Sequence, residues 1–533
     1  MVRRAGVWVR ISIETFATQV AAATAWLRAQ GVRPGDRVGI LSESRYEWAV
    51  MDVAILSMGA VTVPFYQTLP AGQIGPLVAD SGIVGAFASN AAQQEKLELI
   101  RAEGHPLRFL WNFEESGLPE AVPAPDPANE RPPRPEDLAT IIYTSGTSGT
   151  PKGVMLTHAN IVSEVVISLT TWKLNPEDIY LSFLPLSHVL ERISGFYTML
   201  YAGVTIAYAE SFDKLPRDLR EVRPTVLIAV PRLYEKVIAR AIETAAGAGR
   251  FTRSIFQNAY RVAVEAGRLR NEGKQVPPTL ALERTVGFAL VYGKIARGLG
   301  GRTRLRVSGG APLNREVALF YRGAGLPIHE GYGLTETTGA ISVNTYERSC
   351  EGTVGPVFPT IEVRTAEDGE LLVRGPIVMK GYWQKPKETE EALEGEWLHT
   401  GDIGHVDENG FLRITDRKKD LLVMSVGKKV APQPIEAALR SSPRISEALV
   451  LGDGQKYIAA LIVPAVGATR EEIAEDVERV NGNLAQFERI KRFELIPDAM
   501  TIENGMMTPS LKLKRKAVVE HHREAVERLF RGA

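Results

Sequence analysis

Residues 139–154 read ATIIYTSGTSGTPKGV. An apolar strand runs into a loop of threonine, serine and glycine, which closes on Pro151, Lys152 and Gly153. Glycines let backbone N–H groups turn toward an anion. The hydroxyl groups at positions 144, 145, 147 and 148 add donors, and Lys152 adds a positive charge. We therefore predict that this loop binds a polyphosphate.

The spacing of this loop differs from that of a Walker A loop, in which the lysine follows a glycine and precedes a serine or threonine. Lys152 instead follows Pro151 and precedes Gly153. This spacing excludes an ordinary P-loop ATPase. The loop residues alone still leave open that the segment is a polar surface turn.

The segments before the loop have the pattern of a strand–helix–strand unit. Apolar residues at positions 16, 20, 23, 26 and 27 recur in steps of three and four, which predicts an amphipathic helix over residues 15–30. Residues 37–41 and 60–65 are short apolar runs, with a helical stretch at 48–58 between them. Such units form parallel sheets with helices on their faces.

Length and composition restrict the class of protein. The 533 residues exceed the ~300 that one core usually supports, so at least two domains are expected. The formal net charge is zero, which argues against a nucleic-acid partner. The lone cysteine, Cys350, has no partner for an internal disulfide, as in a reducing compartment. We find no signal peptide and no apolar run long enough to span a membrane, so we expect a cytoplasmic protein.

The character of the sequence changes along the chain. Residues 119–137 are rich in proline and predict an exposed connector. Residues 233–300 have a mostly helical pattern, and from about residue 361 short strands alternate with tight turns.

Four later segments resemble motifs of a known family: GYGLTET at 331–337, HTGD at 399–402, DRKKD at 416–420 with GKKVAP at 427–432, and TPSLKLKR at 508–515. Together with the loop at 139–154, and in this order, they resemble the core motifs of the adenylate-forming superfamily. That superfamily includes acyl-CoA synthetases, luciferases and peptide-synthetase adenylation domains. The resemblance extends from residue 143 to residue 515.

The resemblance implies a fold and a division into domains. The fold class would be α/β, or α+β overall. A large N-terminal domain of sheets and helices, residues 1–416, would bind ATP and the acyl group. A small, mobile α+β domain, residues 417–533, would follow a hinge near residues 415–419.

The resemblance also implies a two-step reaction with ATP, Mg²⁺ and CoA. A carboxylate attacks the α-phosphorus of ATP and expels pyrophosphate, and the thiol of CoA then attacks the acyl-adenylate and releases AMP. Thr147 and Glu336 would hold Mg²⁺, which prefers hard oxygen ligands. Lys512 would stabilise the charge that develops during adenylation, although Lys514 lies close enough to leave this choice open.

The same resemblance assigns the nucleotide contacts. Tyr332 would stack on adenine, Gly331 and Gly333 would allow close approach of the backbone, and Asp402 would accept hydrogen bonds from the ribose with Arg417 beside it. The other implied site residues are Lys152 and His188 as catalytic groups, and Thr144, Ser145, Gly146, Ser148, Gly149, Gly310, Ala311, Thr335, Lys419 and Gly427 as cofactor-binding groups.

Further segments resemble the long-chain subgroup of acyl-CoA synthetases: LPLSHVLER at 184–192, VPRLYEK at 230–236, VYGKI at 291–295 and VSGGAPL at 307–313. The implied substrate is therefore a long-chain fatty acid, with His188 near its carboxylate. Peripheral membrane contact and a homodimer stay open. Relatives usually carry several dozen more residues before the helix near residue 15, and an opening without them would expose apolar surface that favours a partner chain.

Two departures keep alternatives open. Leu511 precedes the candidate lysine where the wider family has glycine, and Val426 stands where the subgroup usually has a glycine. The second departure concerns the path of the pantetheine arm. A fatty acyl-AMP ligase that loads a carrier protein is the alternative enzyme. A binding protein with a decayed site is the non-enzymatic alternative.

Overall fold

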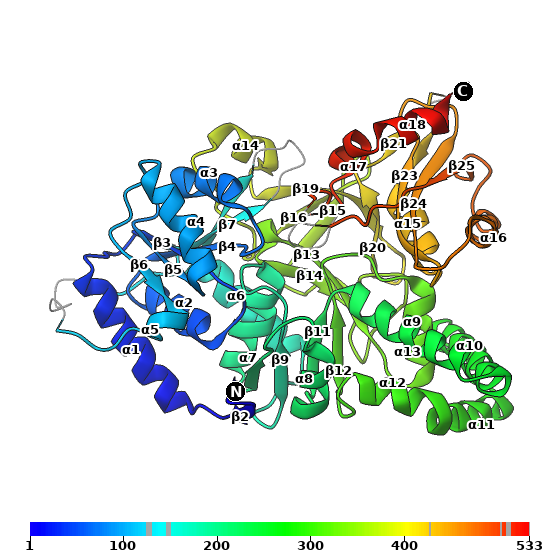
Figure 1. Ribbon diagram of the computed structural model, residues 1–533, viewed down its shortest axis with the longest axis horizontal. Coiled ribbons are helices and arrows are strands. Elements are labelled where there is room, and N and C mark those ends of the chain that lie inside the picture. Colours follow the sequence, from blue (N-terminus) through cyan, green and yellow to red (C-terminus); the bar gives the residue numbers. More distant parts are fainter. Residues whose placement is uncertain (124–130, 145–150, 426–427, 502–503, 508–512, 532–533) are drawn as a thin grey trace.

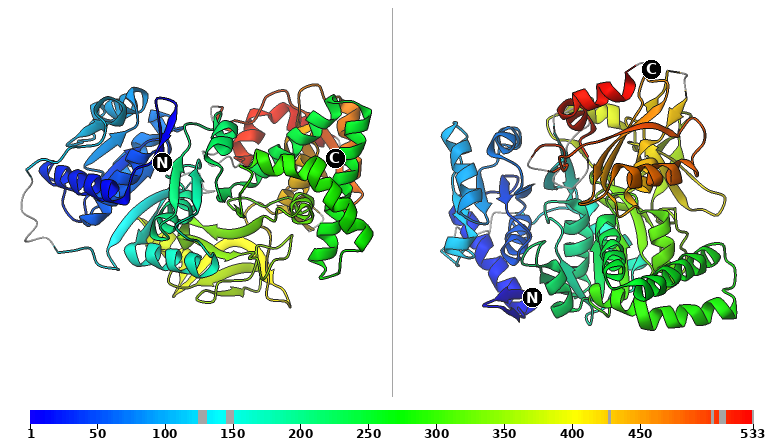
Figure 2. Two further views of the ribbon diagram at one scale, coloured as in Figure 1. Left: turned by 90° about the horizontal axis from the view of Figure 1, so that it is seen from below. Right: turned by 45° about the vertical axis from the view of Figure 1, so that its right-hand side comes forward.

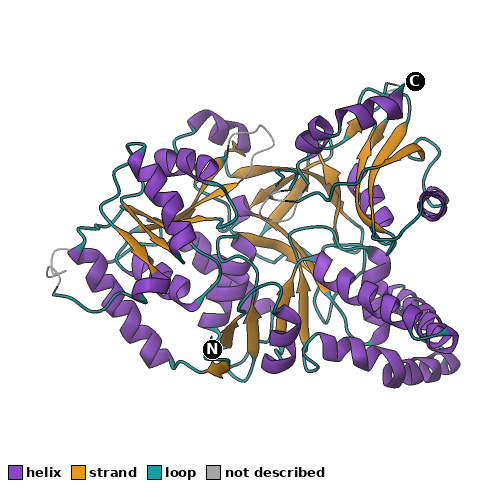
Figure 3. Ribbon diagram, viewed as in Figure 1, coloured by secondary structure: helices purple, strands orange, loops and turns teal. Residues whose placement is uncertain are grey.

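The computed structural model describes residues 1–123, 131–144, 151–425, 428–501, 504–507 and 513–531. Within these residues, sheets of seven, six and five strands are followed by a small three-stranded sheet near the C-terminus. Figures 1 and 3 show the larger sheets in the body of the molecule, with helices packed around them, and the C-terminal sheet set apart at the upper right. The large N-terminal part and the smaller C-terminal part, both of mixed helices and strands, agree with the fold class that the resemblance implies.

The seven-stranded sheet contains the predicted strand–helix–strand unit. Its order is β17-β8-β7-β4-β3-β5-β6. Strands β3 and β4 pair in parallel, with Arg37 opposite Val61, so the prediction is confirmed. The elements of this part are α1 (Ile13–Ala29), β3 (Arg37–Leu41), α2 (Tyr46–Ser57), β4 (Val61–Phe65), α3 (Ala71–Ser81), β5 (Gly85–Ala88), α4 (Ala91–Ala102), β6 (Leu110–Asn112), α5 (Phe113–Ser116), β7 (Leu138–Thr144), β8 (Lys152–Thr157) and β17 (Gly381–Tyr382).

The six-stranded sheet has the order β10-β9-β11-β12-β13-β14 and lies beside the first. Its first five strands are parallel, and β14 closes it in antiparallel pairing with β13. Its elements are α6 (His158–Thr171), β9 (Ile179–Ser182), the π-helical turn η2 (Leu190–Tyr197), α7 (Thr198–Tyr201), β10 (Thr205–Tyr208), α8 (Leu215–Val222), β11 (Val226–Ala229), β12 (Leu305–Ser308), α13 (Arg315–Ala324), β13 (His329–Leu334), the 3₁₀ turn η4 (Thr335–Thr337) and β14 (Gly339–Val343).

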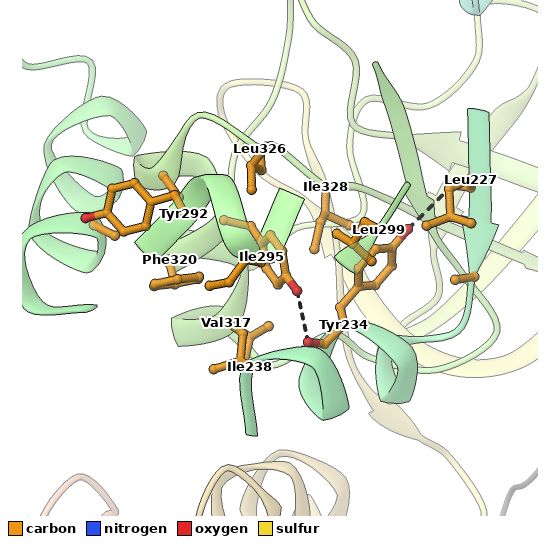
Figure 4. Packing of buried hydrophobic residues seen from close by; sticks show 14 of the residues in the cluster. Leu227, Tyr234, Ile238, Tyr292, Ile295, Leu299, Val317, Phe320, Leu326 and Ile328 are labelled. Carbon is orange, nitrogen blue, oxygen red and sulfur yellow. Dashed lines mark hydrogen bonds between the residues drawn. The ribbon is translucent and has the colours of Figure 1, made fainter. Parts of the chain in front are cut away.

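A group of helices is inserted between β11 and β12, as the sequence predicts. It packs on the six-stranded sheet through a core that Figure 4 shows from close by. There the Tyr234 hydroxyl lies 3.4 Å from the carbonyl oxygen of Leu227 and 3.0 Å from that of Val307, to which it donates, so the polar end of a buried ring is satisfied. The inserted elements are α9 (Pro231–Gly247), α10 (Arg250–Asn271), α11 (Pro278–Gly287), the π-helical turn η3 (Phe288–Tyr292) and α12 (Gly293–Gly298).

The five-stranded sheet is antiparallel and connects the body to the C-terminal part. Its strands are β15 (Glu362–Thr365), β16 (Glu370–Arg374), β18 (Leu393–Glu394), β19 (Trp397–Val406) and β20 (Leu412–Arg417), and α14 (Pro386–Ala392) precedes β18. The antiparallel hairpin β1 (Val2–Arg4) and β2 (Val7–Val9) joins the body by a backbone hydrogen bond of 3.1 Å from the Tyr208 N–H to the Met1 carbonyl oxygen.

The C-terminal part has its own apolar core and touches the body at few points. The Arg232 guanidinium of α9 forms a 2.7 Å ion pair with Glu447, and the Asn314 amide donates over 3.3 Å to the Ala437 carbonyl oxygen. Among the described residues, no helix has the length and apolar character needed to cross a membrane. The C-terminal elements are β21 (Leu422–Val423), β22 (Lys429–Val430), α15 (Pro432–Arg440), β23 (Ile445–Leu451), β24 (Ile458–Pro464), α16 (Arg470–Asn481), β25 (Ile490–Leu495), α17 (Arg515–His521) and α18 (Arg523–Phe530).

Candidate active site

A largely apolar cavity lies along β12 and β13 and brings together three segments that were singled out from the sequence. The predicted residues His188, Gly310, Gly331, Tyr332 and Gly333 all line it. The rest of the wall is mostly apolar and includes Trp172, Leu190, Met199, Ile228, Leu305, Val307, Ala340, Val343 and Phe358. The cavity therefore joins the glycine-rich motif 331–337 to a space suited to an apolar chain.

Two of the glycines at this cavity are needed for structural reasons as well. A Cβ atom on Gly333 would lie 1.8 Å from the carbonyl oxygen of Gly339, because β13 and β14 shift register beside it. Gly310 has φ of +81°, a conformation that side chains disfavour. Close strand packing is therefore a second reason for glycine at position 333, besides the predicted close approach of a ligand.

A second group of predicted residues forms a polar cluster at the edge of this cavity. The Tyr332 hydroxyl donates to Asp402 Oδ2 over 2.6 Å, and Arg417 Nε donates to Asp402 Oδ1 over 2.9 Å. Asp402 and Arg417 are direct partners across β19 and β20, so strand register positions them. Burial, together with the Asp402 charge, raises the pKa of Tyr332 well above its usual value, so this hydroxyl keeps its proton.

A third cluster surrounds Glu336. Tyr382, the residue that links Glu336 to Lys152, was not predicted from the sequence. The Tyr382 hydroxyl donates to Glu336 Oε1 over 2.9 Å, and Lys152 Nζ lies 4.8 Å from the centre of the Tyr382 ring. Burial and the Glu336 charge raise the pKa of Tyr382, so it remains a donor. Tyr382 reaches this place because β17 pairs with β8, with Tyr382 opposite Val154. Since β17 has two residues, one sequence gives no signal for this pairing.

The Glu336 cluster has the chemistry of a divalent-cation site. Glu336 is half-buried and offers a carboxylate, and its turn is fixed by a 2.8 Å hydrogen bond from the Met379 N–H to the Glu336 carbonyl oxygen. A single carboxylate suits Mg²⁺, which usually takes one or two carboxylates and fills its other positions with phosphate oxygens and water. The residues present therefore fit this ion.

The segment that carries His188 is anchored by buried charges. Arg192, in the following turn, is fully buried and donates from Nε to Asp52 Oδ2 over 3.0 Å and from Nη1 to Thr140 Oγ1 over 2.7 Å. The neighbouring Glu191 accepts 2.6 Å hydrogen bonds from Tyr180 and Ser182. These contacts fix η2 against both large sheets. No role for Arg192 could be predicted from the sequence, although the predicted helix at 48–58 contains an acid, Asp52, among apolar residues.

The remaining predicted site residues are distributed as follows. Thr144 and Lys152 are partners at the end of β7 and β8, on either side of the predicted phosphate loop. Thr335 lies beside Glu336 in η4, whereas Ala311 and Lys419 are exposed. Seven predicted residues lie outside the described residues: Ser145, Gly146, Thr147, Ser148, Gly149, Gly427 and Lys512.

Comparisons with protein families agree with this geometry. Residues 1–383 match the AMP-binding enzyme family, and residues 419–533 match the AMP-binding enzyme C-terminal domain. The chain is 38% identical to the long-chain-fatty-acid–CoA ligase FadD15 of Mycobacterium tuberculosis, over 98% of this chain and 93% of the relative. It is 32% identical to the peroxisomal long chain acyl-CoA synthetase 7 of Arabidopsis thaliana, over 94% of this chain and 78% of that protein.

Solved structures give the same fold. The ATP-bound MatB from Rhodopseudomonas palustris superposes with a TM-score of 0.73 at 24% identity, covering 96% of this chain and 94% of that one. A Mycobacterium tuberculosis fatty acyl CoA synthetase superposes with a TM-score of 0.64 at 24% identity, covering 97% and 93%.

Proposed function

Because this chain belongs to the AMP-binding enzyme family, we propose that it is a ligase that activates a long-chain fatty acid with ATP and transfers the acyl group to CoA. The observation that carries the proposal is the apolar cavity whose lining includes Gly331 and Tyr332 of the glycine-rich motif. An acyl chain in that cavity would present its carboxylate to a nucleotide held by the polar clusters. The two curated relatives described above carry long-chain ligase or synthetase names.

The nucleoside would be held at the Tyr332 cluster. Tyr332 forms one wall of the cavity and offers its ring to adenine, while Asp402 accepts hydrogen bonds from the ribose hydroxyls. Each carboxylate oxygen has two acceptor positions, so Asp402 can keep its 2.9 Å contact with Arg417 while it binds the ribose. Arg417 then places a positive charge beside the phosphates. Gly310, Ala311 and Thr335 would contribute to the same pocket.

The phosphates would lie between the loop at 144–153 and Glu336. The loop hydroxyls and backbone N–H groups, with Lys152, would bind the phosphate oxygens. Tyr382 orients both Glu336 and Lys152, since its hydroxyl contacts one and its ring faces the other. Mg²⁺, held by Thr147 and Glu336, would neutralise phosphate charge and align the leaving pyrophosphate.

The first step requires two anions to react, so the site must supply positive charge at the α-phosphate. We assign this role to Lys512, whose ammonium group would stabilise the charge of the transition state. His188 lines the cavity, and its Nδ1 accepts a 3.1 Å hydrogen bond from the Leu190 N–H. That bond fixes the ring, and we assign to His188 the orientation of the acyl carboxylate for attack.

The second step would use a rotation of residues 417–533 relative to residues 1–416 about a hinge at 415–419. Lys419 lies in this hinge and is exposed, and the few contacts between the two parts favour such a motion. The rotation would withdraw Lys512 and bring the segment around Gly427 to the thiol of CoA.

The wall of the cavity would select the chain length. Each buried methylene group contributes ~0.8 kcal/mol, so an acid that fills the cavity binds more tightly than a shorter one. A cytoplasmic enzyme with peripheral membrane contact fits such a substrate, because long-chain acids partition into bilayers. Light scattering on the purified protein tests whether it forms a homodimer.

The two half-reactions test the proposal. Lys512→Ala should abolish pyrophosphate release from fatty acid and ATP, yet should still convert preformed acyl-adenylate and CoA to acyl-CoA. Lys514→Ala, the matched control, should retain both steps. Loss of both steps in Lys512→Ala would contradict the role of this lysine. Acyl-adenylate formation without any thioester in the unaltered enzyme would favour the carrier-protein ligase.

A further inference from the structure

The carboxylate of Glu370 contacts the turn that carries Asp402, although Glu370 is not among the residues predicted from the sequence. Glu370 is the first residue of β16, and its side chain is 6% exposed. Its Oε1 accepts a 2.8 Å hydrogen bond from the Gly401 N–H, and its Oε2 lies 3.2 Å from His399 Nδ1. Both partners belong to the segment 399–402, which ends at the proposed ribose ligand.

The turn at Gly401 interrupts the regular pairing of its strand. Pairing of β16 with β19 continues on both sides of the turn, but residues 400–402 bulge opposite Leu371 alone. Gly401 itself has φ of +70°, a conformation that side chains disfavour. Backbone groups in such a bulge need acceptors and donors from outside the regular ladder, and the Glu370 carboxylate supplies an acceptor.

Lys418 contacts the second oxygen of Glu370 from the predicted hinge, residues 415–419. Its Nζ donates to Glu370 Oε2 over 2.9 Å and lies 2.5 Å from Asp368 Oδ2. The Lys418 N–H also donates to the Gly401 carbonyl oxygen over 2.8 Å. Gly401 is therefore held through its N–H by Glu370 and through its carbonyl group by the backbone of the hinge segment.

Glu370 is ionised in this setting. Burial acts to raise its pKa, but the hydrogen bonds from Lys418, His399 and Gly401 outweigh burial and hold the pKa of Glu370 below its usual value. The Lys418 side chain is 44% exposed, so its ion pair with Glu370 contributes little to the stability of the whole protein. The effect of these contacts is instead local, because they restrict where the turn and Asp402 can lie.

The sheet that contains Glu370 connects the nucleotide cluster to the C-terminal part. β19 pairs with β16 on one side and with β20 on the other, and the chain continues from β20 through Lys418. Figure 1 shows these strands near the middle of the molecule, and the left-hand view of Figure 2 shows the yellow strands of this sheet as a layer at the lower edge. The contact between Glu370 and Lys418 therefore links the ribose turn to the predicted hinge.

We propose that Glu370 is a positioning residue for the ribose, which fixes the turn at Gly401 and thereby the place of Asp402, with Lys418 as its counter-ion. This inference rests on the proposed function, because it requires that Asp402 accepts hydrogen bonds from the ribose hydroxyls. The proposed rotation about residues 415–419 would alter the Lys418 contact, so the affinity for the nucleotide would change with the position of the C-terminal part.

Calorimetric titration of the full-length protein with AMP and with 2′,3′-dideoxy-AMP, which lacks both ribose hydroxyls, tests the proposal. Glu370→Ala should weaken AMP binding about 10-fold to 30-fold, because it removes hydrogen bonds to a charged group. Glu370→Gln keeps an acceptor for the Gly401 N–H and should cost only about threefold to tenfold. The affinity for the dideoxy analogue should stay nearly unchanged in both variants, whereas a role in folding alone would weaken both nucleotides alike.

Variants of Lys418 test the link to the hinge segment. Lys418→Met should weaken AMP binding as much as Glu370→Gln does, and the double variant should bind no more weakly than either, because both changes remove the same ion pair. Lys418→Arg keeps the charge and should restore most of the affinity. Glu362→Gln is the matched control, since Glu362 lies in the same sheet, pairs with Arg374 over 2.7 Å and is 60% exposed. It should bind both nucleotides like the unaltered protein.

The outcomes separate the role of Glu370 from the proposed function. Circular dichroism and thermal melting establish that each variant folds, and Glu370→Gln with Lys418→Met decides the matter if Glu370→Ala does not fold. An unaltered protein that binds AMP no more tightly than the dideoxy analogue would overturn the ribose contact of Asp402 and this inference with it. If the unaltered protein prefers AMP and the folded Glu370 variants keep that preference in full, the proposed function stands and the role of Glu370 is overturned.

Discussion

Replacing Arg192 by methionine should destabilise the protein strongly. The Arg192 and Asp52 side chains form an ion pair in which both are 0% exposed. Methionine keeps much of the side-chain volume but leaves the Asp52 carboxylate buried, with Tyr197 and Thr62 as its remaining hydrogen-bond donors. Removing one partner of a buried pair costs about 3–5 kcal/mol. A surface pair, Lys173 with Glu347, has side chains that are 88% and 62% exposed, so Lys173→Met should cost less than about 1 kcal/mol.

Urea unfolding followed by tryptophan fluorescence measures this difference. Trp48 is a local reporter, because the Arg192 guanidinium carbon lies 5.4 Å from the centre of its ring. Adding Asp52→Asn to Arg192→Met removes the unpaired charge and should recover about 1–3 kcal/mol. Equal costs for Arg192→Met and Lys173→Met, or no recovery in the double variant, would refute the view that this buried pair holds η2 in place.

Three further predictions concern the site and its supports. Tyr382→Phe should lower the rate of pyrophosphate release at limiting Mg-ATP by about threefold to tenfold, since it removes one hydrogen bond to Glu336. Tyr346→Phe is the control. Equal rates in the two variants would count against the positioning role of Tyr382. Burial raises the pKa of Glu191 from 4.5 to about 8. Between these two values the folded state holds a proton that the unfolded state releases. The free energy of unfolding should therefore fall by up to about 1.4 kcal/mol per pH unit as the pH rises from 4.5 to 8. Glu191→Gln should flatten that decline in urea titrations, and an unchanged slope would exclude this group as a cause. Ala340→Leu should shift the preferred fatty acid toward shorter chains in competition assays because Ala340 lines the apolar cavity, whereas an unchanged preference would show that the acyl chain lies elsewhere.

Local patterns made much of the fold predictable. The steps of apolar residues before residue 65 predict α1, β3, α2 and β4 because the periodicity of a helix or strand is expressed within a few residues. The loop at 139–154 and the motif at 331–337 could be singled out because each is a continuous segment, and the phosphate-binding role of the loop stays a prediction. Asp402 and Arg417 are fifteen residues apart in the sequence but neighbours in one hairpin.

The supports of the site could not be predicted, because they depend on contacts between distant segments. Tyr382 meets Glu336 across 46 residues, and Arg192 meets Asp52 across 140. Helical periodicity shows that Asp52 lies in an apolar helix, but it cannot identify the cation that neutralises it. The domain boundary at 416–417 remains a prediction. It falls at the last two residues of β20, which still pairs with β19.

The most direct test of the proposed function is a product assay. The purified protein is supplied with Mg-ATP, CoA and a series of fatty acids from short to long, and AMP, pyrophosphate and acyl-CoA are measured together. We predict equal amounts of the three products, with the highest rate for long-chain acids. Pyrophosphate and acyl-adenylate without acyl-CoA, or no pyrophosphate with any acid in the series, would contradict the proposal.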